Sequence, residues 1–308
     1  MADVIYDSHQ AIENKDSFYN VIRNTGFGAT PFWESLNSGK AFKGDPSKGH
    51  NWEYRPGPTA GGGAENAHAE GSKRADITSW APTKLHNELQ IFKKTSGITG
   101  SQNEAWTIEE KRASINDQIM NNRKQMRLDV EKALVGEQAP VAAATVNDVR
   151  KLGGVKSYIP APAVFDLANA ALSVKNHIDE ALKLMFINGL GGENVIVMAG
   201  SDTYTDLNWY YADKNLYQKN NDITGTNQTI TTGWFQQVNI KANPNFAANE
   251  VLIYAPDLIN PVLLRSVKDR DCTDKTFDYM AKEDVMELTL QVLDPYAAVW
   301  LKNAGRTA

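Results

Sequence analysis

Apolar residues recur along one long segment of the chain at intervals that fit one face of a helix. Between Glu104 and Leu134 there is neither proline nor glycine, and apolar positions fall seven or four apart, at Ile108, Ile115, Ile119, Met126, Val130 and Leu134. Ser101 to Glu104 reads S-Q-N-E, a capping box typical of a helix start, and Gly136 supplies an end. The pattern predicts a helix over residues 104–135, on the order of 45 Å long.

A second apolar stripe follows the segment YIPAPA, in which Pro162 suits the first position of a helix. Its members continue up to Gly189 and are Val164, Leu167, Ala171, Val174, Ile178, Ala181, Met185 and Phe186. We therefore predict a second helix from Pro162 to just before Gly189.

The last third of the chain shows strand patterns instead. VIVMA at 195–199 and VLIYA at 251–255 are short apolar runs. In VMELTLQVL the apolar side chains from Met286 to Val292 alternate with Glu287, Thr289 and Gln291, so the two sets face opposite ways. The polar segment 207–228 predicts surface loops. Mixed helices and strands, with the strands late, indicate an α+β fold.

The first quarter of the chain follows neither period. Residues 1–40 mix turn residues with scattered aromatics, as an arm does, and no large apolar side chain occurs from Gly57 to Gly71. Segments without structure beyond about 12–15 residues are usually functional or disordered. The segment 41–76 has only three large apolar anchors, Phe42, Trp52 and Tyr54. We predict that the first third has no hydrophobic core of its own and is completed by other copies of the chain.

Composition narrows the class of protein. With 308 residues, of which 42% are hydrophobic and 22% charged, the chain is long enough for one large or two moderate globular domains. Its net charge of -5 argues against tight binding of nucleic acid through phosphates. A lone cysteine, Cys272, excludes an internal disulfide and favours a reducing cytoplasm. The first residues do not resemble a signal peptide, and no apolar run is long enough to span a bilayer.

Catalytic and metal-binding patterns are absent. The triple glycine Gly61-Gly62-Gly63 is not followed by Gly-Lys-Ser/Thr, and no serine lies in G-x-S-x-G. The five histidines lack metal-ligand spacing, and the aspartates around Cys272 fit a solvated acidic loop better than a calcium loop. The carboxylates in EEKRASINDQ, a segment of the long helix, are expected on a solvated face with i, i+4 partners. We predict no enzyme activity, no cofactor and no metal ion.

The order of these features resembles the major capsid protein of tailed bacteriophages, the Hong Kong 97 fold. The most specific part is VLIYAPDLINPVLLRSVKDRDCTDKTFDYMAKEDVMELTLQVLDPYAAVWLKN. It is similar to the closing pattern of that family: a strand, an acidic turn, a short helix, a charged loop, an alternating strand, and a proline before a small apolar strand. The segment from Ala69 to Gln102 looks like the connection between loop and helix in one capsid subgroup.

The resemblance implies an N-terminal arm (1–40), an extended loop (41–76), a peripheral domain with a spine helix (77–150), an axial domain (151–261) and returning C-terminal strands (262–308). It also implies a virion protein, assembled in the bacterial host cytoplasm, whose hexamers and pentamers form an icosahedral shell around double-stranded DNA that is not tightly bound. Portal, scaffold or decoration proteins are further partners under this reading.

Six residues are candidates for contacts between subunits, because aromatic anchors and flexible glycines suit such contacts. They are Trp33, Trp52, Tyr54, Gly61, Gly62 and Gly63. Two alternatives remain: an encapsulin-like nanocompartment shell of the same fold, and a soluble carbohydrate-active domain that uses some of the seven tryptophans as a platform.

Overall fold

The computed structural model describes most of the chain from Thr30 onward. The described residues are 30–36, 39–43, 45–55, 67–73, 81–101, 115–145, 147–215, 228–230, 234–235 and 238–306.

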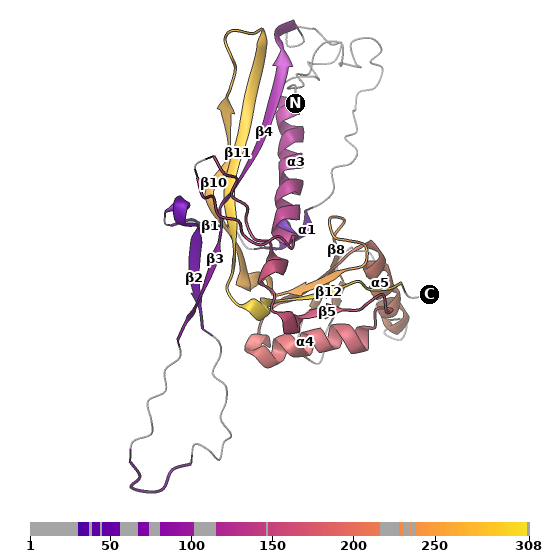
Figure 1. The fold of residues 1–308 in the computed structure, drawn as a ribbon. Helices are drawn as coiled ribbons and strands as arrows, with labels where there is room; N and C mark the ends of the chain where they lie inside the picture. Colours follow the sequence, from indigo (N-terminus) through magenta and orange to yellow (C-terminus); the bar gives the residue numbers. More distant parts are fainter. Residues whose placement is uncertain are drawn as a thin grey trace.

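A four-stranded sheet lies alongside the long helix α3 (Ile115–Val135) and forms with it the elongated part of the molecule (Figure 1). The strand order is β1 (Lys40–Ala41), β10 (Ile259–Asp271), β11 (Tyr279–Val292) and β4 (Gln90–Thr99). β10 and β11 form a long antiparallel hairpin, β4 is antiparallel to β11, and β1 runs parallel to the start of β10.

The predicted stripe of the long helix packs inward. Ile115, Ile119, Met126, Val130 and Leu134 are all buried, and α3 ends at Val135, directly before Gly136. This confirms the stripe from Ile115 onward and the end of the helix. Its predicted start, including Ile108 and most of the capping box, lies outside the described residues.

A six-stranded mixed sheet forms the second body of the structure. Its order is β5 (Val164–Asp166), β12 (Ala298–Lys302), β9 (Val251–Tyr254), β6 (Val195–Ala199), β8 (Val238–Ala242) and β7 (Gln228–Ile230). Helix α4 (Asp179–Met185) contacts β12, and α5 (Ser201–Asn215) contacts β6 and β8. Every residue of β6 and β9 is buried, so the two predicted apolar runs are confirmed as central strands.

The remaining elements are a strand pair, a short helix and several turns. β2 (His50–Tyr54) and β3 (Thr83–Asn87) form an antiparallel pair that projects away from the junction of the two sheets (Figure 1). The short helix α1 (Pro31–Ser35) packs against α3. Short 3-10 turns lie at Pro46–Lys48, Val155–Tyr158, Ala161–Ala163, Pro256–Leu258 and Pro295–Ala297.

The main hydrophobic core runs through both sheets and includes early residues of the chain. Phe32, Leu36, Trp52 and Phe92 belong to it together with side chains of β6, β9, β11 and β12. The expectation that the first third has no core of its own is therefore wrong for the described residues. Apolar residues are sparse there, but several large ones insert into a core that later strands build.

The predicted helix from Pro162 begins too early. Residues Val164–Asp166 form the edge strand β5, which pairs parallel with β12. Ala168 and Asn169 then adopt positive φ angles of 47° and 66°, which no helix allows. Helical structure starts at the π-helical turn Val174–Ile178, continues through α4, and closes with the π-helical turn Phe186–Leu190, so only the second half of the stripe is helical.

Two loop predictions are also wrong. Residues 207–215, predicted as loop, belong to α5, in which Thr203 and Leu207 are buried. Residues 259–271 form the strand β10 instead of a short helix and a charged loop. Its backbone pairs with β11, and its charged side chains stay exposed. The alternation in β11 is confirmed by its register.

Candidate assembly surfaces

Trp52 anchors the β2–β3 pair to its own subunit. The indole is 7% exposed, its Nε1 donates to the Val292 carbonyl at 2.7 Å, and its ring lies 5.9 Å from that of Tyr158. Trp52 therefore offers almost no surface to a neighbour, which corrects its assignment as an inter-subunit contact. Tyr54, at the end of β2, is half-buried, and burial raises the pKa of its hydroxyl.

Asn87 fastens the base of the same pair. Its side-chain amide donates to the carbonyls of Gly153 at 3.1 Å and Leu290 at 2.8 Å, and its Oδ1 accepts from the Gly153 amide at 2.7 Å. Tyr158 adds a bond from its hydroxyl to the His86 carbonyl at 2.7 Å. The base from which the predicted extended loop departs is thus held on several sides. Gly61, Gly62 and Gly63 lie outside the described residues.

His50 packs inside this base without a full set of partners. Its ring stacks on Trp52 with centroids 5.4 Å apart, and its buried Nε2 has no hydrogen-bond partner among the described residues. Burial, with the nearby positive groups His86 and Lys40, lowers the pKa of His50. The adjacent Gly49 has φ 63° and would meet His86 with any Cβ, so this turn requires glycine.

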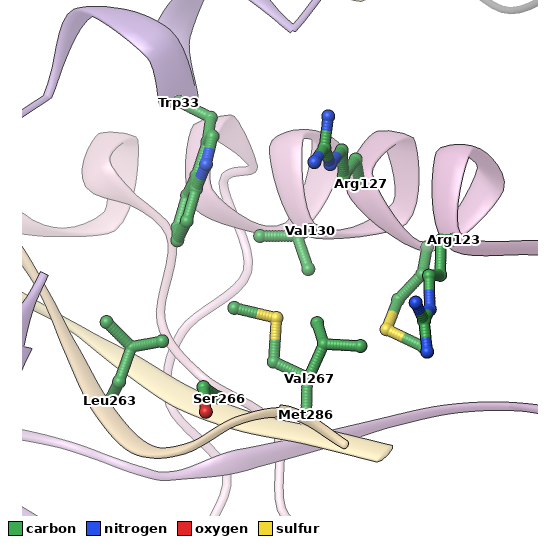
Figure 2. Close-up of a pocket in the computed structure, with 9 residues that line it drawn as sticks. Trp33, Arg123, Arg127, Val130, Leu263, Ser266, Val267 and Met286 are labelled. Carbon is green, nitrogen blue, oxygen red and sulfur yellow. The ribbon is translucent and has the colours of Figure 1, made fainter. Parts of the chain in front are cut away.

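Trp33, another predicted contact residue, lies at a groove between α1, α3 and β10 (Figure 2). The groove has a volume of about 370 Å³. Its apolar lining comes from Trp33, Met126, Val130, Leu263, Val267 and Met286. Figure 2 shows Trp33 descending from α1 on one side and Arg127 and Arg123 extending from α3. Such a mixture of apolar walls and a few polar groups is typical of binding grooves.

The two arginines of the groove differ in their partners. Arg123 binds Asp284 of β11 through two nitrogens, at 3.0 and 2.8 Å, and this hydrogen-bonded carboxylate raises the pKa of the guanidinium. Arg127 is exposed and forms no hydrogen bond or ion pair with any residue that the structure describes. The groove therefore has one positive charge that is free to pair with an incoming carboxylate.

The β10 side of the groove is an irregular strand edge. The pairing of β10 with β11 shifts register on both sides of Arg265, next to Ser266 and Val267. β1 covers β10 only at Val262 and Leu263, and no other described strand pairs with this edge. Val267 is 40% exposed. An apolar side chain on an unpaired edge is a typical feature of a contact surface.

Glu131 is the carboxylate behind the Trp33 wall of the groove. It is fully buried and accepts from the Phe32 and Trp33 amides at 2.9 and 2.7 Å and from the Asn243 side chain at 2.8 Å. Burial raises its pKa, although the three donors act in the opposite direction. The solvated face was predicted for the carboxylates of EEKRASINDQ (109–118), of which Asp117 is exposed, and Glu131 of the same helix is buried instead.

Other buried charges join the same bodies. Glu287 of β11 lies between Arg150 and Arg265, with the nearest nitrogen of each 2.9 Å away. Lys156 and Glu250 form a buried pair at 2.7 Å, and Trp300 Nε1 donates to the same carboxylate at 3.1 Å. These pairs link the region after α3 to both sheets.

The described residues contain no group of three His, Cys, Asp or Glu arranged to hold a metal ion, and none of their helices is apolar and long enough to cross a membrane. Asp271 and Asp274 each accept from the backbone amide two residues ahead, at 2.9 Å, within the β10–β11 turn. Cys272 is exposed and unpaired.

Comparisons with known proteins agree with this architecture. The capsid asymmetric unit of cyanophage A-1(L) superposes with a TM-score of 0.70 at 12% identity, covering 94% of this chain and 97% of the other. The SrpI encapsulin complex of Synechococcus elongatus gives 0.62 at 10% identity, covering 95% and 94%. Mycobacterium phage Che8 gives 0.60 at 12% identity, covering 94% and 97%.

These likenesses, at such low identity, establish the fold alone, which is the Hong Kong 97 type. No curated protein sequence matches significantly. The family is established by a family model, which matches residues 5–305, nearly the whole chain. The chain belongs to the SU10 major capsid protein family, a family of structural capsid subunits.

Proposed function

We propose that this protein is the head subunit of a tailed phage, and that its copies form the hexamers and pentamers of an icosahedral shell around double-stranded DNA. The observation that carries the proposal is the match of a major capsid protein model to residues 5–305. The fold supports it, because two sheets and one long helix share one core and so form a single body. A contact repeated between such bodies closes into a ring when the rotation that relates successive copies is a whole fraction of a full turn.

The division of the chain follows from this role. We assign residues 1–40 to an arm, 41–76 to the extended loop, 77–150 to the peripheral domain, 151–261 to the axial domain and 262–308 to returning strands. Strand β11 pairs with both β10 and β4 beside α3, whereas β12 joins the six-stranded sheet, which supports the assignment of the last segment to both domains.

The partners and location follow from the same role. The net charge of -5 fits a container that does not hold its DNA tightly, because a wall of clustered cations would bind phosphates. Portal, scaffold or decoration proteins would be additional partners. The protein would assemble in the host cytoplasm, reside in the virion and carry no catalytic activity.

The groove at Trp33 is the best-supported contact surface between copies. Its apolar lining with the unpaired Arg127 fits an apolar side chain flanked by a carboxylate from a neighbouring subunit. Tyr54 and the glycines 61–63 stay predicted contacts of the extended loop.

Substituting Val267 tests this surface. Because Val267 is 40% exposed in the subunit, V267D should leave the fold intact while placing a charge in the apolar contact and offering Arg127 a carboxylate within its own subunit instead of the neighbour's. We expect the variant to fold, as judged by circular dichroism, and to fail to form shells in sedimentation. The matched control is V149D, at a site that is 72% exposed and outside the groove. Normal shells from V267D would contradict the assignment.

The runner-up function is an encapsulin-like nanocompartment, which the likeness to SrpI encapsulin favours at the level of fold. The contents of purified particles separate the two functions. Packaged DNA supports the phage head, whereas a co-purified protein cargo supports the nanocompartment. The carbohydrate-active alternative has no support from the family assignment.

A further inference from the structure

The short helix α1 obtains its N-terminal hydrogen bonds from a distant residue. The first amides of a helix lack partners within the helix, and the residue before it usually supplies one. Here the side chain of Thr30 makes no capping bond and instead donates to Glu34 at 3.2 Å. The amides of Phe32 and Trp33, which have no acceptor within α1, donate to the carboxylate of Glu131 on α3.

We propose that Glu131 is a positioning residue, which holds α1 against α3 and the six-stranded sheet and thereby sets the Trp33 wall of the inter-subunit groove. Three elements meet at its two oxygens. Oε1 accepts from the Phe32 amide and from Asn243, which follows β8, while Oε2 accepts from the Trp33 amide. A group that only accepts hydrogen bonds satisfies all three donors at once.

Other contacts of α1 show which side chains are placed when Glu131 holds this helix. The ring of Phe32 lies 5.0 Å from that of Tyr254 in β9, and the hydroxyls of Ser35 and Tyr254 are 2.5 Å apart. The same turn carries Trp33 toward Val130, Leu263 and the rest of the groove (Figure 2). If α1 shifts, the groove loses one wall. The role of Glu131 in assembly therefore rests on the proposed function, whereas its hold on α1 does not.

Replacing Glu131 by leucine tests the hold on α1. E131L keeps a good helix-forming residue of similar size in α3 but leaves three buried donors without their acceptor. Hydrogen exchange is followed in peptides covering residues 30–36 of the unassembled subunit. We expect exchange to accelerate at least about tenfold, because an unsatisfied buried donor is costly, while circular dichroism stays unchanged.

Two companion variants separate this effect from a general change in α3. E131Q keeps a carbonyl oxygen in the position of Oε1 but puts an amide nitrogen opposite the Trp33 amide, so its exchange should lie between those of the wild type and E131L. D129L removes a carboxylate from the same helix, but Asp129 pairs with Lys94 at 2.8 Å and touches no donor of α1. It should leave the exchange of α1 unchanged. Exchange in E131L equal to that in D129L would overturn the proposal.

A second-site change distinguishes positioning from simple capping. In E131L/T30D, the new aspartate supplies a local acceptor for the first amides of α1 but no bond to α3 or Asn243. We expect protection of α1 to recover partly while sedimentation still shows fewer shells than the wild type. Full recovery of assembly would overturn the positioning role. If the wild type itself forms no shells, the proposed function fails, and the exchange experiment still decides the hold on α1.

Discussion

Removing the indole of Trp52 should detach the β2–β3 pair from the core of its subunit. The side chain is 7% exposed, stacks on His50 and donates from Nε1 to the Val292 carbonyl at 2.7 Å. W52A deletes both the packing and the hydrogen bond. W52F keeps most of the packing and deletes the bond. The two variants therefore divide the contribution of Trp52 into its parts.

The magnitudes follow from burial and from the single bond. Truncating a buried large aromatic residue to alanine costs about 3–5 kcal/mol. Losing one hydrogen bond costs about 0.5–1.5 kcal/mol, and the smaller phenyl ring adds a modest packing loss, so W52F should cost about 1–2 kcal/mol. Against a total stability of about 5–15 kcal/mol, W52A is a severe change.

Urea unfolding of the unassembled subunit, followed by circular dichroism, measures these differences. The control is W209A, because Trp209 on α5 is 73% exposed and its loss should change the free energy of unfolding by less than about 0.5 kcal/mol. If W52A destabilises no more than W209A, Trp52 is not the anchor of the hairpin. If W52F costs as much as W52A, the packing argument is wrong.

Three further variants test neighbouring features. R123M should lower the free energy of unfolding by about 1–3 kcal/mol, because it leaves the Asp284 carboxylate, which is 2% exposed, without its bidentate partner. In a double-mutant cycle, R123M/D284N should recover part of that loss. H50F should flatten the pH dependence of unfolding. Because the pKa of His50 is lowered in the folded state, neutral His50 contributes stability above its ordinary pKa of 6.5, and this stability is lost as the pH falls through the folded-state pKa. A wild type and H50F that lose stability in parallel below pH 6.5 would refute this. G49A should destabilise by about 1–3 kcal/mol in thermal unfolding, since its φ of 63° and the adjacent His86 leave no room for a methyl group, and an unchanged transition would contradict that strain.

The spacing of apolar side chains along the chain accounts for most of the correct predictions about the fold. The buried stripe from Ile115 to Leu134 and the apolar runs of β6 and β9 depend on local side-chain order alone, and the structure confirms them. Where a strand pairs with a segment distant in the chain, the local sequence pattern predicts the wrong secondary structure. Val164–Asp166 fits a helical stripe but is a strand because β12, more than a hundred residues later, pairs with it. β10 carries a charged sequence typical of a loop, yet β11 supplies its backbone partners.

The candidate contact surface was only partly visible in the sequence. Trp33 was identified from its aromatic character, and the structure places it at the groove. Trp52 has the same character, but its indole is satisfied inside the subunit, and only tertiary contacts reveal the difference. Glu131 follows Val130 within the buried stripe, which is a weak signal that its carboxylate points inward. Its donors come from residues about a hundred positions away, and no local pattern indicates them.

The most direct test of the central claim is the particle size of the purified wild-type protein, measured by sedimentation and negative-stain electron microscopy. The account predicts closed icosahedral shells built from many copies of the 34.0 kDa chain. A protein that stays a 34.0 kDa monomer across concentration and ionic strength, with no rings or shells in the micrographs, would contradict it.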